Sequence, residues 1–288
     1  MRRGLCFIAA AAIAFSIAAP VSAGPTKTSG PFAYVTSTGT VGPSVDESIS
    51  ASCPTGYQLT GGGGGIAGAP DGTVRIASAD RQPSSKTTFS TGVRNDSATQ
   101  RAMSATAICL RGAAASLLDY ETDNWSSSST GSHRDDASCF GSNVIVGGGA
   151  FVPPPYTPID LEAAHPIIDP LFPTEQDWEM KIYSTTSATT SYRNDVICLP
   201  PTAAHVRSVR KEVVLDGLTG KTVKVACPRG FRVSGGGFDG NAPEIIGSVS
   251  EPYDAGDANK APDDGWLVRA FDPLSDPTVL AAHAVCVR

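Results

Sequence analysis

Apolar and polar residues alternate in short runs along most of the chain. In one such run the alternation puts Trp266, Val268 and Ala270 on a single face. Clusters of Gly, Pro, Asn and Asp separate the runs, and no long stretch carries apolar residues at helical spacing. The pattern therefore predicts an all-β protein. Its expected strands include 206–215, 221–226 and three middle strands near 74–77, 159–163 and 245–249.

The same pattern occurs three times. Each copy opens with a cysteine, has an apolar residue six positions later, and starts a Gly-Gly-Gly triplet eight positions after that cysteine. A large aromatic residue then lies 20 positions before a closing cysteine. Residues 24–288 thus divide into unit 1 (24–110), unit 2 (111–199) and unit 3 (200–288). The markers, unit by unit, are Cys53, Gly61, Phe89 and Cys109; Cys139, Gly147, Trp178 and Cys198; Cys227, Gly235, Trp266 and Cys286.

Residues 1–23 have the pattern of a secretory signal peptide. Two arginines follow Met1, residues 5–19 are apolar, and Val21 and Ala23 suit the small-x-small end of such a segment. The apolar stretch is shorter than the roughly 20 residues that a membrane-spanning helix needs. We therefore expect cleavage after Ala23 and a secreted, extracellular protein, or one in the periplasm or at the cell surface if it is retained.

The acidic charge limits the classes of partner. Losing residues 1–23 removes two arginines, so Lys+Arg falls from 22 to 20 against 28 Asp+Glu, and the net charge moves from −6 to −8. An acidic chain without a basic patch disfavours nucleic acid as a partner. No later segment is apolar enough to cross a membrane. We expect no nucleic-acid binding and no membrane insertion.

Six cysteines remain once Cys6 is removed with the signal peptide. An even number in an exported chain implies disulfides rather than free thiols. Six cysteines allow 15 pairings, but a self-similar unit most simply closes on itself. We therefore predict one disulfide per repeat: Cys53–Cys109, Cys139–Cys198 and Cys227–Cys286.

The openings CPTG at Cys53 and CPRG at Cys227, each followed by an apolar strand, a glycine step and a strand ending in cysteine, resemble a repeat of secreted bacterial proteins. They are also distantly similar to the repeat of the vitelline membrane outer layer protein I family, which carries three copies in a three-sided β-prism. Unit 2 departs from this pattern at Phe140 and Ser142. The resemblance implies a β-prism-like fold of three tandem antiparallel-sheet repeats with pseudo-threefold symmetry, in an extracellular setting, and it transfers no catalytic residue.

Recognisable catalytic motifs are missing from the sequence. The glycine run at 61–65 lacks the Gly-Lys-Ser/Thr of a phosphate-binding loop, so we expect these glycines to permit a bulge or a close backbone approach at the centre. No Gly-x-Ser-x-Gly occurs, and His133, His165, His205 and His283 lie in no metal-ligand spacing. We expect His283 to pack within the last strand and His133 to be solvated. The sequence predicts no enzyme, no cofactor and no metal.

Unit 3 contains an acidic loop whose oxygen ligands would suit calcium. Its spacing does not match the helix–loop–helix calcium pattern, so we expect a solvated loop. The residues concerned are Asp254, Asp257, Asn259, Asp263 and Asp264.

Aromatic residues separate two hypotheses about binding. Those repeated at one position of each unit are expected in the core, and the alternative makes each a sugar-stacking platform. Trp125 lies outside the repeat in a serine-rich, polar setting, so we expect it to be exposed and a better candidate for ligand contact. The proline-rich segment 152–173, expected to hold a rigid apolar loop, adds Tyr156 and Phe172 as possible contacts.

These observations favour a secreted, non-catalytic structural or binding module with an unknown extracellular partner. A carbohydrate-binding, lectin-like protein is the alternative, with one shallow site per unit or one surviving site. An extracellular enzyme or inhibitor is the third hypothesis. Buried repeat aromatics would favour the structural hypothesis, whereas exposed ones beside Asp or Asn would favour a glycan as the partner.

Overall fold

The computed structural model describes residues 22–155, 159–168, 176–242 and 245–288. Within these ranges all regular elements are β-strands apart from one 3-10 helix, Ala113–Leu117, so the all-β prediction is confirmed. Most of the predicted signal peptide lies outside the described residues. Its last two residues, Ser22–Ala23, form β1, and Lys27–Ser29 form β2.

Each unit contributes six strands in the same order. Unit 1 gives β3 (Phe32–Val41), β4 (Val45–Ser52), β5 (Tyr57–Ile66), β6 (Val74–Arg81), β7 (Thr88–Asn95) and β8 (Arg101–Arg111). Unit 2 gives β9 (Asp119–Ser127), β10 (Gly131–Ser138), β11 (Val144–Phe151), β12 (Ile159–Ile168), β13 (Gln176–Ser184) and β14 (Thr190–Leu199). Unit 3 gives β15 (Val206–Leu215), β16 (Gly220–Ala226), β17 (Arg232–Gly240), β18 (Ile246–Tyr253), β19 (Gly265–Phe271) and β20 (Thr278–Val287).

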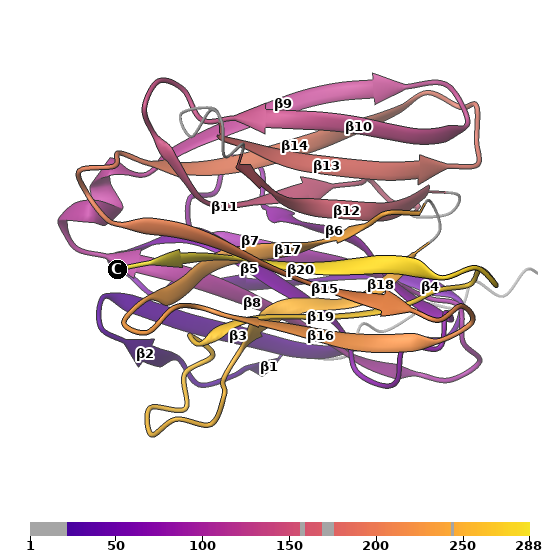
Figure 1. Cartoon of the computed structure of the whole chain (residues 1–288), viewed down its shortest axis with the longest axis horizontal. Coiled ribbons are helices and arrows are strands. Elements are labelled where there is room, and N and C mark those ends of the chain that lie inside the picture. Colours follow the sequence, from indigo (N-terminus) through magenta and orange to yellow (C-terminus); the bar gives the residue numbers. More distant parts are fainter. Residues whose placement is uncertain (1–21, 156–158, 169–175, 243–244) are drawn as a thin grey trace, which may run out of the picture.

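The strands form three antiparallel sheets and run along the long axis of the molecule (Figure 1). Sheet I has the order β1-β3-β8-β5-β18-β19-β16, with β2 paired to β3. Sheet II has the order β4-β7-β6-β11-β14-β9, and sheet III has the order β10-β13-β12-β17-β20-β15.

Every sheet combines strands from two units. Within a unit, the first, sixth and third strands form one half-sheet, and the second, fifth and fourth form another. The third strand of each unit then pairs with the fourth strand of the preceding one: β5 with β18, β11 with β6, and β17 with β12. Unit 1 pairs in this way with unit 3, so the three units form a closed ring of strand pairings. The units therefore share one β-prism-like body, in which every sheet combines strands of neighbouring repeats.

The three disulfides have the predicted pairing, and each joins two different sheets. Their Cα–Cα distances are 5.6, 5.8 and 5.7 Å for Cys53–Cys109, Cys139–Cys198 and Cys227–Cys286. The first cysteine of each pair follows a strand of one sheet, and the second lies in a strand of the next. The bridges therefore connect sheets I and II, II and III, and I and III.

The first glycines of the three triplets meet at the centre of the molecule. A Cβ on Gly235 would lie 2.7 Å from the Cα of Gly147, and a Cβ on Gly61 would lie 3.0 Å from the Cα of Gly235. Three strands thus approach backbone to backbone, as the sequence predicts. A β-bulge accompanies each approach, between Leu59 and Gly61, Ile145 and Gly147, and Val233 and Gly235.

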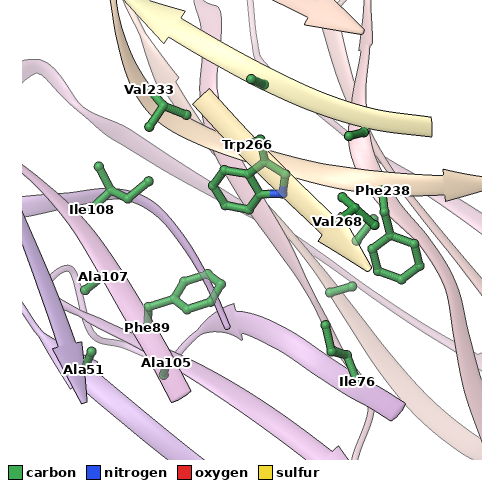
Figure 2. Close-up of a cluster of buried hydrophobic side chains, with 14 of the residues drawn as sticks. Ala51, Ile76, Phe89, Ala105, Ala107, Ile108, Val233, Phe238, Trp266 and Val268 are labelled. Carbon is green, nitrogen blue, oxygen red and sulfur yellow. The ribbon is translucent and has the colours of Figure 1, made fainter. Parts of the chain in front are cut away.

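The middle glycine of each triplet makes room for an aromatic ring from the adjacent sheet. A Cβ on Gly62 would overlap the ring of Phe89, and a Cβ on Gly236 would overlap the ring of Trp266. The side chains of Phe89 and Trp266 point into the shared core, which also contains Ile108 (Figure 2). Phe89, Trp178 and Trp266 are each 1% exposed, so the prediction that the repeat aromatics are core residues is confirmed.

Candidate functional site

The third glycine of each triplet marks an equivalent position on all three sheets. It lies between a residue of the unit's sixth strand and a residue of the preceding unit's fourth strand, and a Cβ there would clash with the fourth strand's backbone. Directly paired residues of antiparallel strands share a face, so these neighbours can interact across the glycine. We call each such set of three residues, which are neighbours across a sheet, a row. The three rows are Thr106–Gly63–Glu251 on sheet I, Asp195–Gly149–Asp80 on sheet II and His283–Gly237–His165 on sheet III.

On sheet II the row is a closed network of charges. Arg81 and Arg193 each place a guanidinium nitrogen 3.0 Å from a carboxylate oxygen of Asp195, and Arg193 also contacts Asp80. Burial raises the pKa of Asp80 to about 8, opposed by Arg193 and reinforced by Asp195. All four side chains are buried, and each carboxyl group contacts at least one of the two guanidinium groups. These contacts join β6 and β14 across β11.

On sheet I the row borders a hollow of about 190 Å³. Glu251 lines it, and burial raises the pKa of Glu251 against the hydrogen bond from Ser104 and the charge of Arg269. The remaining lining is mainly apolar or glycine, which gives a small pocket with one carboxyl group. The other lining residues are Thr38, Gly65, Ile66, Ala67, Ala102, Met103, Ser104, Val249 and Arg269.

On sheet III the row brings two histidines together. The rings of His165 and His283 stack with centroids 4.3 Å apart and planes 18° apart, and both residues are buried. His165 Nε2 lies 3.3 Å from Glu179 Oε1, and Arg134 Nε lies 2.7 Å from Glu179 Oε2. Burial raises the pKa of Glu179, but His165, Arg134 and Lys181 outweigh it, so this pKa is lowered overall.

Asp239 of β17 completes the cluster on sheet III. Ligand atoms of His165, Asp239 and His283 all lie within 4.8 Å of one another. Arg210, which pairs with His283 across β15 and β20, places a guanidinium nitrogen 3.5 Å from Asp239 Oδ2. Two imidazoles and a carboxylate form a donor set that suits a transition-metal ion. The chain spacing gave no sign of it, because the three residues come from three strands of two units.

The acidic loop of unit 3 also gathers carboxylates, with ligand atoms of Asp254, Asp257 and Asp264 within 4.8 Å. Each of them accepts a hydrogen bond from a backbone amide of the same loop. The prediction of a solvated loop is wrong at Asp263, which is 5% exposed and whose Oδ2 lies 3.4 Å from Arg232 Nε.

Trp125 differs from the exposed side chain that the sequence suggests. It lies in β9, where it is partly buried, with its ring centroid 4.6 Å from that of Tyr192 and 6.1 Å from that of His133. His133 lies in β10, where it is half-buried, and its Nε2 lies 2.9 Å from Ser129 O. The proposed contacts Tyr156 and Phe172 lie outside the described residues.

Phe140 is a large exposed apolar side chain that the sequence pattern did not indicate as a ligand contact. It is 69% exposed and borders a hollow of about 290 Å³ between β9 and β10. Its position corresponds to the proline of the CPTG and CPRG openings. The departure of unit 2 from the repeat at this position could therefore have indicated a candidate contact residue. The other residues lining this hollow are Glu121, Thr122, Asp123, Asp136, Ala137 and Ser138.

No protein-family model matches the chain, and no curated protein matches its sequence. The resemblance to the vitelline membrane outer layer protein I family therefore stays a prediction from sequence motifs. Among the described residues, no helix has the length and apolar character needed to span a membrane. The three disulfides are typical of an oxidising compartment.

Proposed function

We propose that the protein is a secreted, non-catalytic module that serves a structural or binding role outside the cell. The burial of Phe89, Trp178 and Trp266 carries this proposal, because a platform for sugar stacking in every unit would need these rings exposed. Three disulfides that join sheets support an extracellular setting. The closed charge network of Asp80, Asp195 and two arginines supports a mechanical rather than a catalytic use of the polar groups on sheet II.

A glycan array probed with residues 24–288, carrying intact disulfides, tests this proposal. We expect no glycan binding that depends on the three repeat aromatics. The decisive comparison is Trp266→Phe, which keeps an aromatic ring in the core. Loss of a glycan signal in this folded variant would overturn the structural proposal in favour of a lectin with repeated sites.

A lectin-like protein with one surviving site is the second candidate, and the hollow beside Phe140 favours it. An exposed ring next to carboxylates combines a stacking surface with hydrogen-bond acceptors for sugar hydroxyls. Glu121, Asp123 and Asp136 supply those carboxylates. Under this hypothesis Phe140→Ala abolishes binding on the array while the thermal midpoint stays unchanged, whereas Leu218→Ala, at another exposed apolar residue, preserves binding.

A further inference from the structure

We propose that His165, Asp239 and His283 form a binding site for one divalent transition-metal ion on sheet III. The three side chains come from β12, β17 and β20, which are adjacent strands, and their ligand atoms converge within 4.8 Å. Gly237 lies between the two histidines in the row and carries no side chain to separate them. This inference concerns a ligand of its own and does not depend on the proposed function.

The donor set determines the class of metal. Imidazole nitrogens with a carboxylate suit Zn²⁺, Cu²⁺ and Ni²⁺. Ca²⁺ and Mg²⁺ prefer sites made entirely of oxygen ligands, which this cluster does not provide. Solvent would supply the remaining coordination positions, because the same face carries the half-exposed Arg210.

His165 has the orientation typical of a metal-ligating histidine. Its Nδ1 lies 3.1 Å from the carbonyl oxygen of Pro166. A carbonyl oxygen only accepts hydrogen bonds, so Nδ1 carries the proton and donates it. Coordination through Nε2 would require the neutral ring, with Nε2 turned toward the ion and away from Glu179 Oε1, which lies 3.3 Å from it. Metal-binding histidines commonly fix their tautomer through such a backbone contact.

His283 supplies the second, independent observation. It is 6% exposed, and its Nε2 is buried without a hydrogen-bond partner among the residues that the structure describes. A buried polar nitrogen without a partner is costly. A metal ion would give that nitrogen a partner.

Coordination requires a local rearrangement that the surroundings allow. Donor atoms about 2.0–2.1 Å from a tetrahedral Zn²⁺ lie roughly 3.3 Å apart, and those of the present cluster lie within 4.8 Å of one another. The Asp239 side chain is 25% exposed and can turn inward once Arg210, whose side chain is 48% exposed, releases it to bind solvent. The two imidazole rings then leave their parallel stack so that both nitrogens face the ion.

Isothermal titration of the disulfide-bonded chain with Zn²⁺ at neutral pH tests the site, using protein without a histidine tag and after dialysis against a chelator. We expect one saturable site per chain with micromolar affinity. NMR spectra of the histidine rings should show shifts for His165 and His283, with His205 unaffected. The absence of saturable binding would overturn the proposal.

Matched variants locate the site. Asp239→Asn keeps the side-chain shape and should weaken Zn²⁺ binding by about tenfold or more, while His165→Gln should abolish it. His205→Gln and Asp257→Asn are controls for histidine number and for the acidic loop, and both should bind like the wild type. If His165→Gln fails to fold, Asp239→Asn decides the question alone. Unchanged affinity in Asp239→Asn, or loss of binding in Asp257→Asn, would contradict the assignment.

Discussion

Gly236 in sheet III lies directly against the indole ring of Trp266 in sheet I, so closely that a Cβ on the glycine would overlap the ring. Both residues belong to unit 3. Gly62 with Phe89 in unit 1 and Gly148 with Trp178 in unit 2 make the same contact. In each unit, an aromatic ring of one half-sheet therefore packs directly on a glycine of the other half-sheet. This contact explains why the glycine triplet and the aromatic residue recur together in the sequence.

Adding a single methyl group at this contact should destabilise the protein. Gly236→Ala forces the Trp266 ring and the β17 backbone apart, and we expect a loss of about 1–3 kcal/mol in the free energy of unfolding. Gly42→Ala is the control, because a Cβ there would make an ordinary contact 3.4 Å from a Val45 methyl group. Chemical denaturation of both variants provides the measurement. Equal stability of the two would show that the ring does not rest on Gly236.

Removing the Trp266 ring should lower the free energy of unfolding more than crowding it with Gly236→Ala. Trp266→Ala deletes a side chain that is 1% exposed and leaves a cavity, so the free energy of unfolding should fall by about 3–5 kcal/mol. Phe140→Ala, at a ring that is 69% exposed, should change it by less than about 0.5 kcal/mol. A stable Trp266→Ala variant would contradict the placement of this ring in the core.

The disulfides should contribute strongly to stability because each closes a loop of 56 or 59 residues and joins two sheets. Replacing Cys139 and Cys198 together by alanine should lower the free energy of unfolding by about 4 kcal/mol in the loop-entropy model. The variant is compared with the wild type by thermal melting without reductant. A shift of only a degree or two would mean that this bridge does not hold sheets II and III together.

Stability should depend on pH through Asp135. Burial, reinforced by Asp123 and opposed by Asn194, raises the pKa of Asp135 to about 6, above the unfolded value of about 3.9. The folded state therefore binds the proton more tightly. This contribution to stability is complete below about pH 4 and is lost as the pH rises to about 6.

The measurement compares unfolding free energies at pH 4 and pH 7 for the wild type and for Asp135→Asn. Because Asp135 is partly open to solvent, we expect the wild type to lose only about 1 kcal/mol more than the variant over this range. Asp276→Asn, at an exposed aspartate, serves as the control and should follow the wild type. Parallel curves for the wild type and Asp135→Asn would refute the effect of Asp135.

Much of the fold could be predicted from local patterns in the sequence. Alternation along the chain indicated strands, and the fixed offsets between cysteines, glycines and aromatics indicated three units and their disulfides. The aromatic position shared by the three units indicated that Trp266 is a core residue. These features succeed because each depends on residues of a single unit, whose spacing is visible in the sequence.

The exchange of strands between units could not be predicted in this way. Nothing local indicates that β17 pairs with β12 of the preceding unit rather than with a strand of its own. The approach of His165 to His283 depends on that pairing and on the register at Gly237, so the histidines seemed isolated in the sequence. Trp125 was misjudged because the serines after it suggested a loop, whereas β9 continues to Ser127 and packs the ring against Tyr192.

Amide–amide nuclear Overhauser effects in a perdeuterated sample test the closed, shared architecture most directly. The account predicts contacts across all three junctions between units, at Gly64 with Ser250, Ala79 with Ala150, and Ala164 with Phe238. Contacts within a unit, such as those between β5 and β8, serve as the internal control. If the contacts within units are present while those at the three junctions are missing, each unit forms its own sheets and the shared prism is wrong.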